Sequence, residues 1–173
     1  RPISCDFWGW GLWGCVLTGG TVVVADTRSR LVPELTADLI ERERVSILSQ
    51  TPTAFAMLSR HLVARTVPAL RYVVFGGEAL PSSVIRPWAN ANGLDTPALI
   101  NMYGITECTV HLTFHRVTAS DLDMPAVPIG KPLPGFEATL VDGTGRTGVS
   151  QGVLHVRGPQ VVQGYRNRPQ ETM

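Results

Sequence analysis

The 173-residue chain is predicted to be an α/β protein: a doubly wound, mainly parallel sheet followed by a small, barrel-like all-β unit. Two observations predict this class. Short β-branched runs alternate with helical patterns up to about residue 103, as in parallel sheets with right-handed crossovers. After about residue 112, prolines, glycine turns and alternating runs replace the helical patterns. We therefore expect one subdomain at residues 1–111 and a β-rich one, truncated at its C-terminus, at residues 112–173.

The first elements follow from spacing and composition. Residues 7–17 predict a helix, because large apolar residues recur at helical spacing, although three glycines weaken it. Residues 21–25 are β-branched, as in a buried strand. Residues 33–43 predict a helix that has a proline in its first turn. A short strand at residues 45–48 then precedes a helix at residues 53–65 with one apolar stripe.

The later elements place a candidate site. Residues 72–75 predict a strand closed by Gly-Gly, and residues 81–92 predict a helix that ends at Asn-Gly, a helix-stop signal. A strand at residues 99–103 ends in Tyr-Gly. Ligands of such sheets bind at the carboxyl ends of the strands, where both glycine turns lie. The further strands are expected at residues 111–117, 137–141 and 153–157.

Composition excludes several classes of function. A net charge of +1 without a basic cluster argues against nucleic acid or an anionic membrane as the main partner. Three cysteines without Cys-x-x-Cys spacing indicate free thiols in a reducing compartment, so we expect a cytoplasmic protein. No apolar run is long enough for a membrane helix. Neither end shows capping or termination signals, and the chain is expected to be the central part of a longer one.

The turn after the fourth predicted strand combines several chemical groups. Its residues are Asn101, Met102, Tyr103, Gly104, Ile105, Thr106 and Glu107. An aromatic ring can stack on a base, glycine lets the backbone approach a ligand, a hydroxyl can bond a phosphate, and a carboxylate can hold Mg²⁺. The alternative is an ordinary strand end with Thr106 and Glu107 in solvent.

Asp6 is the second informative residue, because it is the only charged residue between Arg1 and Asp26 and has aromatic neighbours. A carboxylate in such surroundings is costly to bury unpaired. No cation lies nearby in the sequence, so a substrate ammonium would suit it. The alternative is a helix N-cap, since Asp6 precedes the apolar helical pattern.

These motifs resemble those of adenylate-forming enzymes. The turn at residues 101–107 is similar to the superfamily's Asn-x-Tyr-Gly-x-Thr-Glu motif, and residues 5–14 resemble a motif of nonribosomal peptide synthetase adenylation domains. Residues 17–24, 51–53, 76–80, 128–135, 152–158 and 164–165 continue the likeness. The chain departs from the motifs at Cys5, Trp8, Gly11 and Gln163, which puts in doubt the packing around the first helix.

The resemblance implies an amino-acid pocket in which Asp6 takes the α-ammonium. The implied lining residues are Phe7, Trp10, Ser49, Val74, Gly76, Met102, Val110 and His111. The set resembles the signature of threonine-activating domains. Ser49 and His111 could bond a side-chain hydroxyl, and a site built for a hydroxyl rejects analogues without one by roughly 10⁴-fold or more. Serine or a modified threonine stays open as the substrate. The alternative for His111 is a histidine on a surface strand.

The resemblance also implies an ATP site, with Tyr103 stacking on adenine, Thr106 bonding phosphate and Glu107 binding Mg²⁺. The implied nucleotide-binding residues are Gly76, Gly77, Glu78, Asn101, Met102, Tyr103, Gly104 and Thr106. The family's phosphate loop, its ribose-binding Thr-Gly-Asp and its catalytic lysine are expected outside this sequence, so the chain alone is predicted to be inactive.

The sequence thus predicts part of a domain that forms aminoacyl-AMP from ATP and an amino acid, with threonine as the favoured substrate. The domain would then load the phosphopantetheine thiol of a carrier domain, with a condensation domain and a small accessory protein as further possible partners. Two alternatives stay open. An acyl- or aryl-CoA ligase would give no reason for a carboxylate at Asp6, and a non-catalytic binding module would fit the departures at Trp8 and Gly11.

Overall fold

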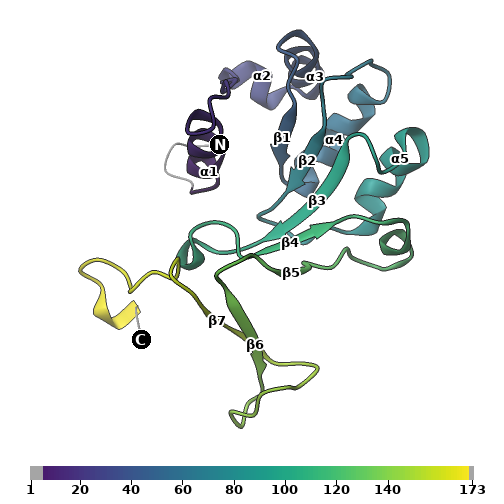
Figure 1. Ribbon diagram of the computed structural model, residues 1–173. Helices are drawn as coiled ribbons and strands as arrows, with labels where there is room; N and C mark the ends of the chain where they lie inside the picture. The colour runs from purple at the N-terminus through teal and green to yellow at the C-terminus, as the bar shows by residue number, and fades with distance from the viewer. Residues whose placement is uncertain (1–5, 172–173) are drawn as a thin grey trace.

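The computed structural model describes residues 6–171, so the departure at Cys5 lies outside the described residues. The main sheet has the strand order β1 (Ile47–Gln50), β2 (Tyr72–Phe75), β3 (Ala98–Tyr103), β4 (Thr113–Arg116) and β5 (Lys131–Pro132). The first three strands are parallel, and β4 and β5 run antiparallel to their neighbours. The sheet fans across the molecule with helices on both sides (Figure 1).

The helices cover the two faces of this sheet unequally. Helices α3 (Pro33–Arg42), α4 (Pro52–Leu62) and α5 (Ser82–Asn92) pack on one face, and α1 (Asp6–Val16) lies on the other (Figure 1). Side chains alternate along a strand. Accordingly, Val73 and Phe75 belong to the core under α3–α5, while Val74 between them faces Trp10 of α1. The predicted doubly wound arrangement is confirmed.

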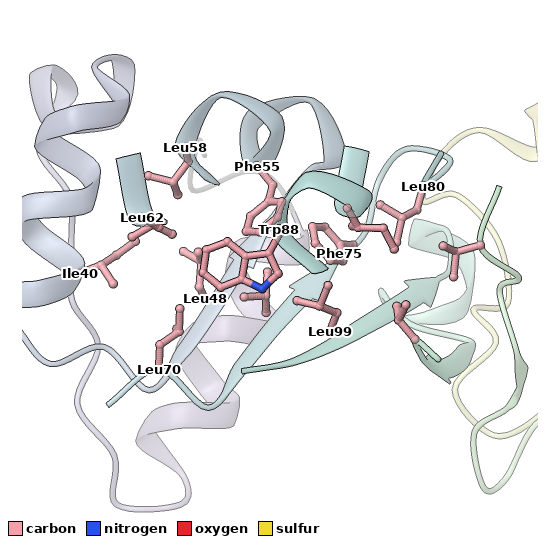
Figure 2. Close-up of a cluster of buried hydrophobic side chains, with 14 of the residues drawn as sticks. Ile40, Leu48, Phe55, Leu58, Leu62, Leu70, Phe75, Leu80, Trp88 and Leu99 are labelled. Carbon is pink, nitrogen blue, oxygen red and sulfur yellow. The ribbon is translucent and has the colours of Figure 1, made fainter. Parts of the chain in front are cut away.

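Aromatic rings make the centre of the larger core. Phe55 of α4 is fully buried and meets Phe75 of β2 and Trp88 of α5 edge-on, with ring centroids 5.0 and 5.6 Å away. Figure 2 shows these rings surrounded by leucines from the strands and helices. The apolar stripe predicted for the helix at residues 53–65 is therefore the face that α4 buries.

A small separate sheet follows the main one. Strands β6 (Glu137–Val141) and β7 (Val153–Arg157) form an antiparallel hairpin that projects from the body of the protein (Figure 1). Its base is anchored by a cluster in which Leu154 and Val156 pack against Phe136, Cys108 and Leu112. The 3₁₀ turn η1 (Thr106–Cys108) belongs to that contact, so the hairpin reaches the turn that follows β3.

The remaining elements are short. Helix α2 (Thr27–Leu31) was not predicted, although Asp26 caps it by accepting a 2.8 Å hydrogen bond from the Ser29 amide. The 3₁₀ helices η2 (Ala119–Asp123) and η3 (Pro169–Glu171) lie in the C-terminal half. In η2, Asp121 is buried and accepts bonds from the Thr118 amide and hydroxyl and from His115. Within residues 6–171 no helix is long and apolar enough to cross a membrane.

The predicted strand at residues 21–25 is wrong. These residues form no strand, and Val24 is 76% exposed. The β-branched composition favours extended backbone, but a strand also needs a neighbour to pair with, and residues 21–25 pair with none of the described strands, although β1 at the edge of the sheet has one free side. The strand predicted at residues 45–48 lies two residues later, at Ile47–Gln50.

Sheet membership changes later along the chain than expected. The predicted division lies between residues 111 and 112, but β4 and β5 still belong to the main sheet, and the separate sheet begins at Glu137. The reason is that the chain turns back after β3 and pairs antiparallel with it, which needs only a short connection. The C-terminal strands form a hairpin and an extension of the first sheet rather than a barrel. The two-subdomain division itself stays a prediction.

Replacing Phe55 by alanine should lower the free energy of unfolding by about 3–5 kcal/mol, the usual cost of emptying a large aromatic site in a core. Met57→Ala on the same helix is the matched control, because Met57 is 58% exposed and should cost under about 0.5 kcal/mol. Urea unfolding measures both. Equal losses for the two variants would contradict the packing described here.

Asp121 should make the free energy of unfolding depend on pH in the acidic range. Burial alone raises its pKa, but the hydrogen bonds from His115 and Thr118 outweigh it and leave the pKa below the usual value. Because the pKa of Asp121 is lower in the folded state, its ionised form stabilises the fold at pH values above the ordinary aspartate pKa. That stabilisation is lost as the pH falls through the lower pKa of the folded state.

Asp121→Asn should therefore cost about 1.5–3 kcal/mol at neutral pH, the range for a hydrogen bond to a charged group. It should also flatten the fall of the free energy of unfolding between about pH 5 and pH 2. Urea unfolding across that pH range measures both effects, and an unchanged acid slope would contradict this role for Asp121.

Candidate functional site

Three rings meet over the carboxyl end of β2. Phe7 and Trp10 of α1 contact His111, which follows the turn after β3, with ring centroids 5.1 and 4.9 Å from the imidazole. Both contacts are edge-on, the arrangement that aromatic rings prefer. His111 is 5% exposed, so it is not the surface-strand histidine of the alternative interpretation. Residues 7, 10 and 111, predicted to share a pocket, are brought together.

Gly76 lies directly beneath these rings. A Cβ added there would be 2.8 Å from the Phe7 ring and 3.3 Å from the His111 ring. The site therefore requires glycine, because any side chain would push the rings away. The same added atom would be 3.5 Å from the Met102 carbonyl oxygen, so β3 borders this spot as well.

The strands supply a row of predicted pocket residues on the face toward α1. Ser49 pairs in register with Val74, and Val74 pairs with Ile100. Met102 lies two residues farther along β3, hence on the same face. Trp10 packs against the Val74 and Met102 cluster. Ser49, Val74 and Met102 thus share one face at the carboxyl ends of β1, β2 and β3, where the ligand site was predicted.

Asp6 lies at the first described turn of α1 and reaches a residue 100 positions away. One of its carboxylate oxygens accepts a 2.7 Å hydrogen bond from the Thr106 hydroxyl. The other accepts a 2.7 Å bond from the amide of its neighbour Phe7. The predicted ammonium ligand and the predicted phosphate ligand are therefore adjacent.

The turn between β3 and β4 doubles back tightly on itself. An added Cβ on Gly104 would be 2.1 Å from the Val110 carbonyl oxygen and 2.8 Å from the His111 Cα. Thr109 and Val110 have φ angles of 55° and 79°, a left-handed region that β-branched residues rarely adopt. Thr109 is held there by a 2.7 Å bond from its hydroxyl to the Gln160 carbonyl. This strained backbone places the His111 side chain against the rings of α1.

Glu107 is partly buried and is bonded from the C-terminal part of the chain. The Tyr165 hydroxyl donates to its carboxylate, and its backbone carbonyl accepts a 2.9 Å bond from the Val162 amide. The hydrogen bond from Tyr165 lowers the pKa of Glu107 and raises the pKa of Tyr165. The negative charge of Asp6 acts in the opposite direction on the pKa of Glu107. The lowered pKa keeps Glu107 ionised at neutral pH.

The predicted nucleotide-binding residues do not all lie on the same side of the sheet. Tyr103 is 38% exposed at the end of β3, where its ring is accessible, and Gly77 and Glu78 follow β2. The Asn101 side chain lies elsewhere: it is buried and donates to the carbonyls of Val127 and Pro128. Neighbouring side chains of a strand point to opposite faces, and Met102 lies on the face toward α1. The Asn101 amide therefore lies on the face away from α1 and supports the strand end.

Sequence reasoning assigned no role to Thr53 and Tyr165. Thr53 donates through its amide (3.1 Å) and its hydroxyl (2.6 Å) to the Glu78 carboxylate, which joins the turns after β1 and β2. Tyr165 contacts Glu107 from 58 positions away. Both residues lie in motifs that the sequence does show, but their partners are distant in the chain and no local pattern names them.

Comparisons with known proteins agree on one family. The profile of the AMP-binding enzyme family matches residues 1–166. The chain is 46% identical over 172 residues to syringomycin synthase SyrB1 of Pseudomonas syringae pv. syringae, covering 97% of this chain and 28% of that protein. It is 37% identical over 174 residues to a dimodular nonribosomal peptide synthase of Bacillus subtilis, covering 95% of this chain and 7% of that protein.

Solved structures show the same fold. PA1221, described as a nonribosomal peptide synthetase protein with adenylation and carrier domains, superimposes with a TM-score of 0.88 at 29% identity and covers all of this chain and 35% of its own. The Vibrio cholerae adenylation domain AlmE, solved with glycyl-adenosine-5'-phosphate, gives a TM-score of 0.82 at 25% identity over 98% and 33%. The chain thus spans about a third or less of these relatives.

Gly104→Ala should disrupt the site by overpacking, because backbone atoms of Val110 and His111 occupy the space that the methyl group needs. We expect a loss of about 1–3 kcal/mol in the free energy of unfolding. The near-ultraviolet circular dichroism of the ring cluster should change as well.

The matched control is Gly9→Ala in α1, where an added Cβ has open space. That variant should be unchanged or more stable by up to about 1 kcal/mol, since alanine favours a helix. A Gly104→Ala protein with the stability and spectrum of the wild type would contradict the tight turn.

Proposed function

Because this chain belongs to the AMP-binding enzyme family and is of the nonribosomal peptide synthetase adenylation type, we propose that it forms part of a domain that activates L-threonine with ATP. In that reaction a carboxylate oxygen of the amino acid attacks the α-phosphorus of ATP. Aminoacyl-AMP forms and pyrophosphate leaves. The phosphopantetheine thiol of a carrier domain then displaces AMP and takes the aminoacyl group as a thioester.

The observation that carries this proposal is the bond between Asp6 and Thr106 beside the ring cluster. Asp6 offers a carboxylate for the α-ammonium, and Thr106 offers a hydroxyl for phosphate. A substrate with its ammonium at Asp6 would have its carboxylate near the phosphate group. Holding two reactants in this way is the main contribution that a protein makes to such a transfer.

The side-chain pocket would be formed by the rings and the strand row. Phe7, Trp10, Val74 and Met102 supply apolar walls, and Val110 closes them beside the turn. Gly76 lets the Phe7 and His111 rings pack directly on the backbone at the end of β2. Ser49 and His111 are the polar members, and both would bond the threonine hydroxyl. Serine keeps that hydroxyl and lacks only a methyl group, whereas valine lacks the hydroxyl.

The nucleotide would extend from the strand ends toward the exposed Tyr103 ring. Gly76, Gly77 and Glu78 would border adenine with the backbone of Asn101 and Met102, and Gly104 keeps the turn close enough for Thr106 to reach phosphate. The donor set fits Mg²⁺, which binds through one or two carboxylates plus substrate phosphates. Glu107 would hold the ion, and the bound ion would neutralise phosphate charge.

We keep the other expectations as part of this proposal. The catalytic lysine would lie outside the chain, which by itself would be inactive. A carrier domain would be the direct partner, and a condensation domain and a small accessory protein would be further ones. We expect the cytoplasm as the compartment, where ATP is supplied and the thiols of Cys15 and Cys108, free in the structure, would stay reduced.

Amino-acid-dependent exchange of pyrophosphate into ATP, measured on the intact domain that contains this chain, tests the proposal. Threonine should give the highest kcat/KM. Valine should be slower by roughly 10⁴-fold because Ser49 and His111 would lose their partner, and serine by about 10–200-fold because only a methyl contact is missing. Valine turnover equal to that of threonine would overturn the hydroxyl argument.

Asp6→Asn tests the ammonium site in the same assay. Loss of the negative charge should lower kcat/KM for threonine by about 100-fold, the scale of a hydrogen bond to a charged group. Asp95→Asn is the control, because the Asp95 side chain is 98% exposed. Exchange that depends on an aryl or fatty acid instead would identify a CoA ligase. No exchange with any acid would indicate a binding module.

A further inference from the structure

The segment at residues 158–165, which follows the hairpin, is bonded to the turn at residues 106–109 at three points. The Thr109 hydroxyl donates to the Gln160 carbonyl (2.7 Å), the Val162 amide donates to the Glu107 carbonyl (2.9 Å), and the Tyr165 hydroxyl donates to the Glu107 carboxylate. Two of the bonds hold the turn itself. The third fixes a side chain, and that side chain is the one assigned to Mg²⁺.

We infer that Tyr165 is a positioning residue for the metal site: its hydroxyl holds the Glu107 carboxylate in the orientation that receives Mg²⁺ with ATP. The inference rests on the proposed function and adds a residue to it. Tyr165 is far from the ring cluster in sequence and joins the site through Glu107, at the opposite end of the turn.

Side-chain freedom gives the physical reason. Glutamate is among the side chains that lose most rotamer freedom when they are ordered. A carboxylate already held by a hydroxyl donor has lost that freedom before the ion arrives, so the ion binds more tightly. Hydrogen-bonded partners of metal ligands act in this way generally, and their loss typically weakens metal binding by about 10–100-fold.

Packing offers a weaker explanation for Tyr165. The residue is 43% exposed, and the cluster at the hairpin base consists of other residues, Val156 and Val161 among them. Its hydroxyl contacts the Glu107 carboxylate. Removal of that hydroxyl alone should therefore affect the ion more than the fold.

The test is Tyr165→Phe in the intact domain, with Tyr72→Phe as the matched control. Tyr72 is 41% exposed and lies on β2, away from the turn. ATP affinity is measured by calorimetry in saturating Mg²⁺ and again in a chelator. Tyr165→Phe should weaken ATP binding about 10-fold in Mg²⁺ and by less than about twofold without it. Tyr72→Phe should change neither value.

A second comparison, made in a Glu107→Gln protein, tests whether Tyr165 acts through Glu107. In Glu107→Gln, the Tyr165→Phe change should have no further effect on ATP affinity in Mg²⁺, because the group that it positions is gone. Equal weakening with and without Mg²⁺ would overturn the inference and make Tyr165 a structural residue. So would an unchanged affinity in Mg²⁺.

The two proposals fail in distinguishable ways. A wild-type domain that catalyses threonine-dependent exchange, combined with a Tyr165→Phe variant of normal Mg²⁺-dependent affinity, would overturn only the role of Tyr165. A wild-type domain whose ATP binding does not depend on Mg²⁺ would overturn the metal assignment of Glu107, and the inference with it. Thermal unfolding of each variant shows whether the fold is retained.

Discussion

The close approach of Gly104 to the Val110 carbonyl is the constraint on which the candidate site depends. Because the chain reverses there, β4 pairs antiparallel with β3 and His111 arrives over Gly76. The reversal requires two consecutive residues, Thr109 and Val110, in a left-handed backbone conformation. Such strain persists only where the surrounding structure holds it, and the bond from Thr109 to the segment at residues 158–165 is part of that support.

Three stretches of chain that lie far apart in sequence therefore build one site. Helix α1 brings a carboxylate and two rings, the strand ends bring a glycine floor, and the turn after β3 brings a hydroxyl and a second carboxylate. The acidic side chains of Asp6 and Glu107 lie on either side of Thr106, and the negative charge of one repels that of the other. One ammonium and one metal ion would relieve that repulsion, which is the pairing that amino-acid activation with ATP supplies.

Local patterns predicted the regular elements well where tertiary contacts agreed with them. The strands at Tyr72–Phe75, Glu137–Val141 and Val153–Arg157 have the predicted bounds, because each is a short apolar or alternating run between turn residues. The run at residues 21–25 has similar composition but no strand beside it. Whether such a run becomes a strand depends on a neighbouring strand to pair with, and local composition does not reveal that neighbour.

The candidate site shows the same division. Family motifs named Asp6, Thr106 and Glu107, and the structure places the first two in contact. The partners Thr53 and Tyr165 were missed, because each acts across a distance that no motif spans. Asn101 illustrates the converse: it stands inside a motif, but strand alternation turns its amide to the far face, where two backbone carbonyls hold it.

The bond between Asp6 and Thr106 has a thermodynamic consequence. A phosphate that takes the Thr106 hydroxyl would remove one hydrogen-bond donor from the Asp6 carboxylate, and an ammonium at Asp6 would replace that donor. Under the proposed function, a bound nucleotide would therefore leave Asp6 with a greater affinity for the ammonium. By linkage, each ligand would then raise the affinity for the other by the same factor. Cooperativity between monomer and nucleotide would thus originate in a single hydrogen bond.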